Sequence, residues 1–304
     1  MIGANLLKQL KRCLLWLGLA FCILTLWRSQ GLSTKSHEPF GLLQFVYIAI
    51  LLLLIWLLAV SSWRAYLQAY ALAETSWRTA IRQLGLLLMG KYIPGGIFGF
   101  VMRIYDQPKT QRQKLLLASI ADQCTGLGTT ILFGGALFLT ATSRNWLWAT
   151  LALSLPALSS IGVNLLQYCV RLTPWASRLT PISEKPRNGH LRLAATFQLG
   201  QATAWAGLTT LLAIHLYNLD IYTAVGVAGA YLLAVGTGML IIFLPGGIGA
   251  REASLAALAA TWIDLPQALY LGALMRILTS LVDVLAGTCS MAVNTGRWRR
   301  CPPS

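Results

Sequence analysis

Two short stretches of the chain combine a helix break with a nearby arginine. They read KYIPGGIFGFVMR over residues 91–103 and FLPGGIGARE over residues 243–252. Proline removes a backbone donor and clashes with the preceding turn, and glycine lets the backbone turn tightly, so each Pro-Gly-Gly predicts an interrupted helix. A half-helix restarting there points free N–H groups and its positive dipole end at the break, which favours phosphate or carboxylate. The candidate headgroup-binding residues in these stretches are Lys91, Pro94, Gly95, Gly96, Arg103, Pro245, Gly246, Gly247, Arg251 and Glu252.

Ionisable residues inside apolar runs form a second group of candidates: Asp122, Arg276 and Asp283. Each costs about 2.5–3.5 kcal/mol at a helix centre on insertion scales, so we expect them to face the interior and pair. Arg276 and Asp283 are seven residues apart and share a helix face. Two interpretations stay open: structural ion pairs between helices, or a polar track for a lipid headgroup. Gln198 and Gln201 are expected to bond between helices.

The sequence contains no motif typical of metal binding, thiol redox chemistry or magnesium-diphosphate chemistry. The three histidines have no metal-ligand spacing, and the six cysteines form no CxxC motif. No DxxD or ExxE pair is present to hold magnesium on a diphosphate. We therefore predict no metal, no cofactor and no enzymatic activity.

Composition sets the class of protein. Hydrophobic residues make up 56% of the chain and charged residues 11%, and several apolar runs reach 18 residues, so the sequence predicts a polytopic membrane protein. The net charge of +15 lies on Lys and Arg in short loops between apolar runs. That pattern indicates membrane topology and attraction to anionic lipid rather than nucleic-acid binding.

The apolar runs predict an all-α fold with about seven to eight transmembrane helices. The predicted spans cover about residues 13–27, 40–62, 115–139, 146–170, 193–217, 222–244 and 265–293. Basic residues place segment 63–83 in the cytoplasm, and its apolar stripe of Tyr66, Leu67 and Tyr70 is expected to lie along the interface.

The first break has basic flanks on both sides, so its arms, about 80–92 and 97–103, are expected to form a re-entrant hairpin. Basic residues also place both termini in the cytoplasm, which requires an even number of crossings. Segment Ile248–Ile263 would then cross although it is short, or the count differs by one, and the sequence leaves both open.

The two breaks stand at matching places in the chain. The prolines are 151 residues apart in a chain of 304. We therefore expect one membrane domain, 1–304, with pseudo-repeat halves of about 1–170 and 193–304 joined by a cytoplasmic loop, 171–192. Interrupted helices at corresponding places in inverted-repeat halves are a pointer to a transporter's binding site.

The motifs KYIPGGIFGFVMR and PGGIGARE resemble the signature segments of the lysylphosphatidylglycerol synthase transmembrane (flippase-like) domain family. The resemblance implies a bacterial or archaeal inner-membrane protein that moves lipids or glycolipids between leaflets, with the motif residues around a central cavity. Bifunctional members carry a C-terminal domain that transfers lysine from aminoacyl-tRNA. The sequence shows no such domain, so aminoacyl transfer is not expected.

The sequence leaves three hypotheses for the function of this protein. The first is a translocator of a lipid with an anionic headgroup, a phospholipid or a lipid-linked sugar. The alternative is a non-transporting membrane partner of a glycosyltransferase or lipid-modifying synthase, which a closed core without a cavity would favour. The less favoured third is an intramembrane headgroup transferase, which would bring Asp122 and Glu252 into one cavity.

Overall fold

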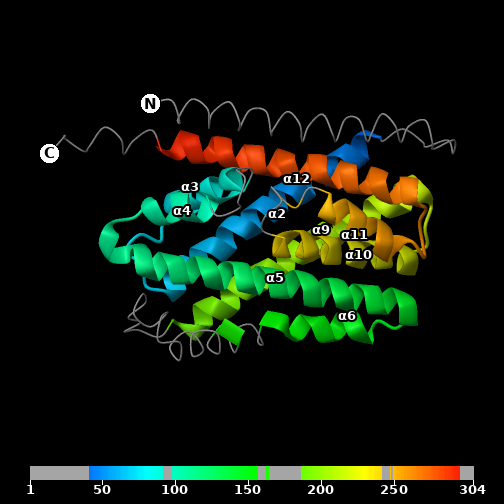
Figure 1. The fold of residues 1–304 in the computed structure, drawn as a ribbon, viewed down its shortest axis with the longest axis horizontal. Coiled ribbons are helices and arrows are strands. Elements are labelled where there is room, and N and C mark those ends of the chain that lie inside the picture. The colour runs from blue at the N-terminus through cyan, green and yellow to red at the C-terminus, as the bar shows by residue number, and fades with distance from the viewer. Residues whose placement is uncertain are drawn as a thin grey trace.

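The computed structural model describes residues 41–91, 98–156, 162–163, 186–241, 247 and 249–294. Within these ranges the regular structure is helical and contains no strand (Figure 1). The helices are α2 (Leu42–Ala69), α3 (Trp77–Gly90), α4 (Phe98–Tyr105), α5 (Arg112–Ser143), α6 (Leu147–Leu151), α9 (Asn188–Tyr217), α10 (Ile221–Leu240), α11 (Ala250–Ala259) and α12 (Leu265–Asn294), with short 3-10 turns η1 (Lys109–Gln111) and η2 (Ala152–Ser154). The predicted all-α fold is confirmed.

Four helical segments are long and apolar enough to cross a membrane: Leu42–Ala69, Lys109–Ser143, Ile221–Leu240 and Leu265–Val293. The outward side of α2 exposes a row of large apolar side chains that includes Leu43, Phe45 and Ile50, which suits contact with lipid tails. The 30-residue helix α9 is as long as these spans but less apolar. The chain is therefore a multi-pass membrane protein.

Most helices run roughly along the long axis of the molecule, so that the bundle has two opposite ends (Figure 1). At the basic end, Arg187 N donates to Ala69 O at 2.9 Å and Ser290 Oγ donates to Arg82 O at 2.9 Å. Most Lys and Arg of the described chain gather there: Arg64, Arg78, Arg82, Lys109, Arg112, Lys114, Arg187 and Arg192. At the opposite end, Tyr217 Oη donates to Gln267 O at 2.8 Å, and Asp220 caps α10.

Helix α2 corrects one boundary. The sequence predicts a span ending at Ser62 and an interfacial segment after it, but α2 continues to Ala69. Tyr66 and Leu67 are fully buried in the protein, and Tyr70 nearly so, because this last part of the helix packs against α5 and α9. The expectation that their stripe lies along the membrane interface is therefore wrong.

Glycines set the contact between the antiparallel helices α5 and α10. A Cβ on Gly229 would lie 2.6 Å from the Phe138 backbone nitrogen, and a Cβ on Gly134 would lie 2.8 Å from Leu232. Gly134 and Gly229 thus allow the close approach of these two helices. Neither Gly128 nor Gly135 has an atom within 4 Å of such a Cβ, so these two do not serve that role in the described structure.

Helices α3 and α4 form a hairpin. Gly90, the last residue of α3, meets the backbone of Gly99 so closely that neither could carry a side chain. Near the base, Arg82 Nη2 and Asp106 Oδ2 form a salt bridge at 2.6 Å. Both arms of the hairpin therefore have their outer ends at the basic end of the molecule. Between the arms, the chain contains the predicted break at Pro94, Gly95 and Gly96, which lies outside the described residues.

Helix α11 runs back along α10. A Cβ on Gly238 would lie 2.5 Å from Arg251 Cγ, while near the other end of α10 a Cβ on Gly226 would lie 2.7 Å from Trp262. Its ten residues rise about 15 Å, half of a hydrocarbon core, so α11 alone is too short to span. Pro245 and Gly246, the predicted second break, lie outside the described residues.

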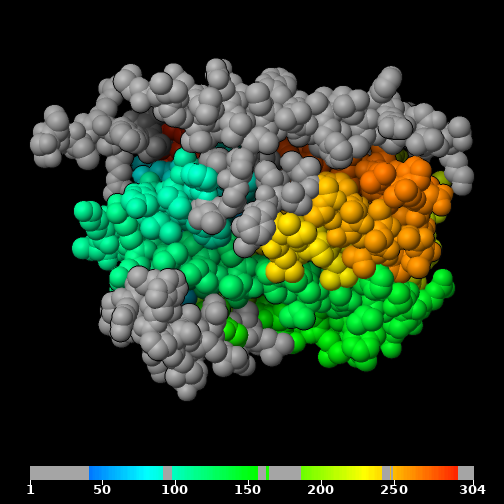
Figure 2. Space-filling view, in the orientation of Figure 1, coloured from blue at the N-terminus to red at the C-terminus, as the bar shows by residue number. Residues whose placement is uncertain are grey.

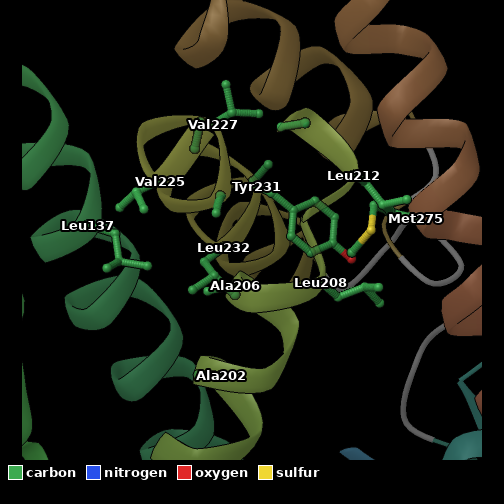
Figure 3. Close-up of a cluster of buried hydrophobic side chains, with 14 of the residues drawn as sticks. Leu137, Ala202, Ala206, Leu208, Leu212, Val225, Val227, Tyr231, Leu232 and Met275 are labelled. Carbon is green, nitrogen blue, oxygen red and sulfur yellow. The ribbon is translucent and has the colours of Figure 1, made fainter. Parts of the chain in front are cut away.

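The buried apolar side chains form two clusters. One joins α5, α9, α10 and α12 towards the opposite end and includes Leu137, Leu212 and Leu232 (Figure 3). The other joins α2, α3, α5 and α9 towards the basic end and includes Trp63, Leu115 and Leu191. The candidate site lies between them, and its walls take residues from both clusters.

Candidate functional site

A cavity of about 450 Å³ opens at mid-length, where α2, α3, α5, α9, α10 and α12 all contribute side chains. This volume falls in the range of small-molecule sites, which are mostly apolar with a few placed polar groups. Among the described residues, its wall includes Lys91 before the first break and Gly247 and Arg251 at the second. The two interrupted segments therefore flank one cavity. In Figure 2 they lie on one face, cyan for α3–α4 and yellow to orange for α11 and the start of α12.

Arg251, the second residue of α11, brings a positive charge to this wall. Within the described chain it forms no salt bridge, and its Nε has no hydrogen-bond partner. Its side chain lies across Gly238 on α10, where a Cβ would sit 2.5 Å from Cγ and 2.7 Å from Nε. Gly238 thus leaves the space that Arg251 needs to reach the cavity.

The turn before α11 is shaped by backbone and carboxylate together. Gly247 and Gly249 have φ of 69° and 83°, a left-handed region that favours glycine. Glu252 Oε2 accepts a hydrogen bond from Gly249 N at 2.8 Å, which caps the helix start. The predicted headgroup residue Glu252 is therefore engaged in holding the turn that presents Arg251.

Lys91 meets the cavity from the end of α3. Its Nζ lies 2.6 Å from Asp283 Oδ2 on α12, and the Asp283 side chain is almost fully buried. Close packing of α3 on α12 supports this pair, since Gly85 and Gly287 would both clash if they carried a Cβ. Lys91 and Asp283 both line the cavity, as a neutral pair.

Arg103 sits behind the wall and is fully buried. Its Nη1 lies 3.3 Å from Asp122 Oδ2, and its Cζ lies 3.1 Å from the centre of the Trp63 ring. Gln198 Nε2 donates to the Asp122 backbone O at 3.0 Å and to Oδ1 at 3.1 Å. Of this group, Trp63, Asp122 and Gln198 line the cavity, so Arg103 neutralises and positions a wall residue.

A second, water-sized cavity of about 10 Å³ adjoins the first and shares Tyr231, Arg251 and Thr279 with it. Glu252 and Arg276 line this small cavity, with Arg276 Nη1 at 4.0 Å from Glu252 Oε1. Asp122 lines only the larger one. The described structure thus places the two carboxylates of the third hypothesis in different cavities.

Indole rings and amides make up the remaining polar wall. Trp56 on α2 and Trp205 on α9 line the cavity together with Gln201 and Gln198. Contacts between Ser62 and Ala194 and between Leu58 and Gly200 set the antiparallel register of α2 and α9. This register brings Trp56 level with Gln201.

The predicted pairing of ionisable residues inside the membrane is confirmed: Asp122 pairs with Arg103, Asp283 with Lys91, and Arg276 with Glu252. The expected bond between helices is confirmed for Gln198. Binding of a headgroup by any of these residues stays a prediction. Trp56, Trp205 and Tyr231 were not among the predicted site residues, because a tryptophan or tyrosine in an apolar run has no pattern that separates a cavity wall from packing.

Comparison with known proteins supports the membrane class. No curated protein and no solved structure matches the chain. A protein-family model described as "Lysylphosphatidylglycerol synthase TM region" matches residues 4–287. Because this match covers nearly the whole sequence, the chain belongs to the lysylphosphatidylglycerol synthase TM region family.

Proposed function

We propose that this protein is a flippase-like translocator that moves a lipid with an anionic headgroup between the leaflets of the membrane. The observation that carries the proposal is Arg251 on the wall of the 450 Å³ cavity, without a salt bridge in the described chain. A half-buried cation that makes no direct salt bridge is left poorly compensated, and an incoming phosphate would supply a direct partner. The acyl tails would stay in lipid while the headgroup uses the cavity.

The charge balance around the cavity supports an anionic headgroup. The nearby cations are Lys91, Arg103, Arg251 and Arg276, and the nearby carboxylates are Asp122, Glu252 and Asp283. One positive charge is therefore in excess among the described residues. Helix α11, which starts one residue before Arg251, adds its positive dipole end on the same side.

The test is reconstitution in liposomes with labelled anionic phospholipid or lipid-linked sugar. Arg251→Gln should reduce translocation about tenfold or more, since one charge-assisted contact to phosphate is lost. The exposed Arg78→Gln is the matched control and should move lipid at the wild-type rate. Equal rates for wild type, Arg251→Gln and protein-free vesicles would overturn the proposal.

Orientation forms part of the same proposal. We place the basic end in the cytoplasm of a bacterial or archaeal cell, in its inner membrane, with both termini inside and the α3–α4 hairpin re-entrant from that side. Introduced cysteines test it: Asp220→Cys should react with an impermeant maleimide on intact cells. Arg78→Cys should react only after permeabilisation. The reverse labelling pattern would contradict the proposed orientation.

The alternative of a non-transporting partner for a glycosyltransferase or synthase is less well supported, because it gives no role to a cavity between the two breaks. The third hypothesis, a transferase, would need Asp122 and Glu252 at one reacting centre. We propose a protein that is not an enzyme, has a lipid as its ligand and does not bind nucleic acid.

A further inference from the structure

The wall formed by α2 and α9 differs in chemistry from the charged wall around Arg251. It presents the indole rings of Trp56 and Trp205 and the amides of Gln198 and Gln201. Among the described residues, the carboxylate on this side of the cavity is Asp122, which is already engaged by Arg103 and Gln198. An apolar tail needs no amide, and a phosphate would be drawn to the other wall, so these groups call for a different part of a ligand.

Two atoms on this wall lack hydrogen-bond partners in the described structure. Gln198 Oε1 is buried without a donor, and Trp56 Nε1 is buried without an acceptor. The amide orientation of Gln198 is fixed, because Nε2 donates to two acceptors of Asp122, so Oε1 remains the acceptor. Buried polar atoms in proteins are nearly always paired, so an unpaired donor and an unpaired acceptor among the residues that line one cavity indicate a missing partner.

Hydroxyl groups are partners that suit either atom. A hydroxyl donates one hydrogen bond and accepts others, whereas an ammonium only donates and a phosphodiester only accepts. Several hydroxyls on a ring would also use Gln201, and the C–H faces of such a ring pack well against indole. The wall is electrically neutral once Arg103 and Asp122 are paired, which suits an uncharged polyol.

We propose that this wall is a sugar subsite, so that the ligand is a lipid whose phosphate carries a sugar or a similar cyclic polyol. This inference rests on the proposed function, because it names the substrate class of the same cavity. In it, Arg251 takes the phosphate, while Trp56, Gln198, Gln201 and Trp205 take the ring. The four are specificity residues, and Arg103 is a positioning residue for Asp122.

The experiment compares two prenyl phosphodiesters of equal charge, one esterified with a hexose and one with methanol. Binding to the purified full chain in detergent is measured by thermophoresis. We expect wild type to prefer the hexose lipid about tenfold or more, the worth of two or more hydrogen bonds. Trp56→Phe keeps the ring and loses only the N–H, so it should weaken hexose binding about fivefold and leave methyl binding unchanged.

Two further variants separate this role from a structural one. Gln201→Met keeps the side-chain size and should lower the hexose preference in the same way. Trp148→Phe, an exposed tryptophan away from the cavity, is the control and should keep the wild-type preference. Equal affinity of wild type for both lipids, or equal loss for both in Trp56→Phe and Gln201→Met, would overturn the sugar subsite.

The two proposals fail separately. Selective binding of the hexose lipid without any movement across vesicles would remove the translocator and keep the subsite. Movement of both lipids at equal rates, with Arg251→Gln inactive, would keep the translocator and remove the subsite.

Discussion

The two interrupted segments share the Pro-Gly-Gly motif but use their arginines in opposite ways. In the first, Arg103 is fully buried, neutralised by Asp122 and covered by Trp63. In the second, Arg251 lies on the cavity wall and its neighbour Glu252 holds the preceding turn instead of pairing with it. One copy of the motif therefore stabilises the wall of the site, while the other contributes a positive charge to it.

The spacing of each arginine from its break explains the contrast. Arg103 follows its proline by nine residues and Arg251 follows its proline by six. Three residues correspond to about 4.5 Å of helix rise, so Arg251 stays nearer the break. Gly238 then leaves room for its side chain, whereas Arg103 meets the face of Trp63.

The strongest test of this contrast is stability. Arg103→Met leaves Asp122 buried without its cation, and breaking such a pair costs about 3–5 kcal/mol. Thermal unfolding in detergent, followed by tryptophan fluorescence, should show a large fall in midpoint. Arg251→Gln should unfold close to wild type, because no described partner is lost. Similar midpoints for the two variants would show that Arg103 and Arg251 contribute equally to stability.

Alanine at the glycine contacts gives the next largest effect. Gly90→Ala places a methyl group against the backbone of Gly99, which cannot move aside, so we expect a loss of about 1–3 kcal/mol. Gly238→Ala places its methyl group against the flexible side chain of Arg251, so it should reduce lipid movement with a smaller change in unfolding midpoint. Gly128→Ala, with open space, is the control. Equal destabilisation at positions 90 and 238 would argue against the contrast.

The Lys91–Asp283 pair should give an intermediate coupling. Lys91→Met removes the cation 2.6 Å from the buried Asp283 carboxylate, and Lys91→Met with Asp283→Asn removes both charges. The double variant should recover part of the lost stability, by about 1–3 kcal/mol, as expected for groups that interact directly. Unfolding of the two single variants and the double variant measures this coupling. Strict additivity would show that the pair does not brace the first segment.

The smallest expected effect is at the cap of α11. Glu252→Ala removes the acceptor for Gly249 N, which should cost about 1 kcal/mol as for a typical helix cap, and it also removes the carboxylate 4.0 Å from Arg276 Nη1. Glu252→Gln keeps an acceptor and should lose less. The unfolding midpoints of both variants, beside lipid movement, show whether Glu252 acts through the turn. A greater loss in Glu252→Gln than in Glu252→Ala would contradict the capping role.

Much of the fold could be read from the sequence. Apolar runs with basic loops predict the helices, and the high cost of charge in a membrane predicts the pairing of Asp122, Arg276 and Asp283. The end of α2 was placed too early, because polar and basic residues after Ser62 look like a loop until tertiary packing covers Tyr66.

The site was harder to predict than the fold. The motif marks Arg103 and Arg251 alike, and only the packing of Trp63, 40 residues before Arg103 in the chain, separates them. Trp56 and Trp205 come to line one cavity only through the register of α2 and α9, which depends on contacts such as Leu58 with Gly200. Sequence spacing carries no signal for such long-range juxtapositions.

The division of the apolar interior into two clusters has a mechanical consequence. Each cluster is densely packed, so each end of the bundle resists deformation, while the hollow middle between them has fewer atoms to pull apart. The region around the cavity is therefore the most easily deformed part of the molecule. There the two ends of the bundle can tilt against each other with little loss of van der Waals energy.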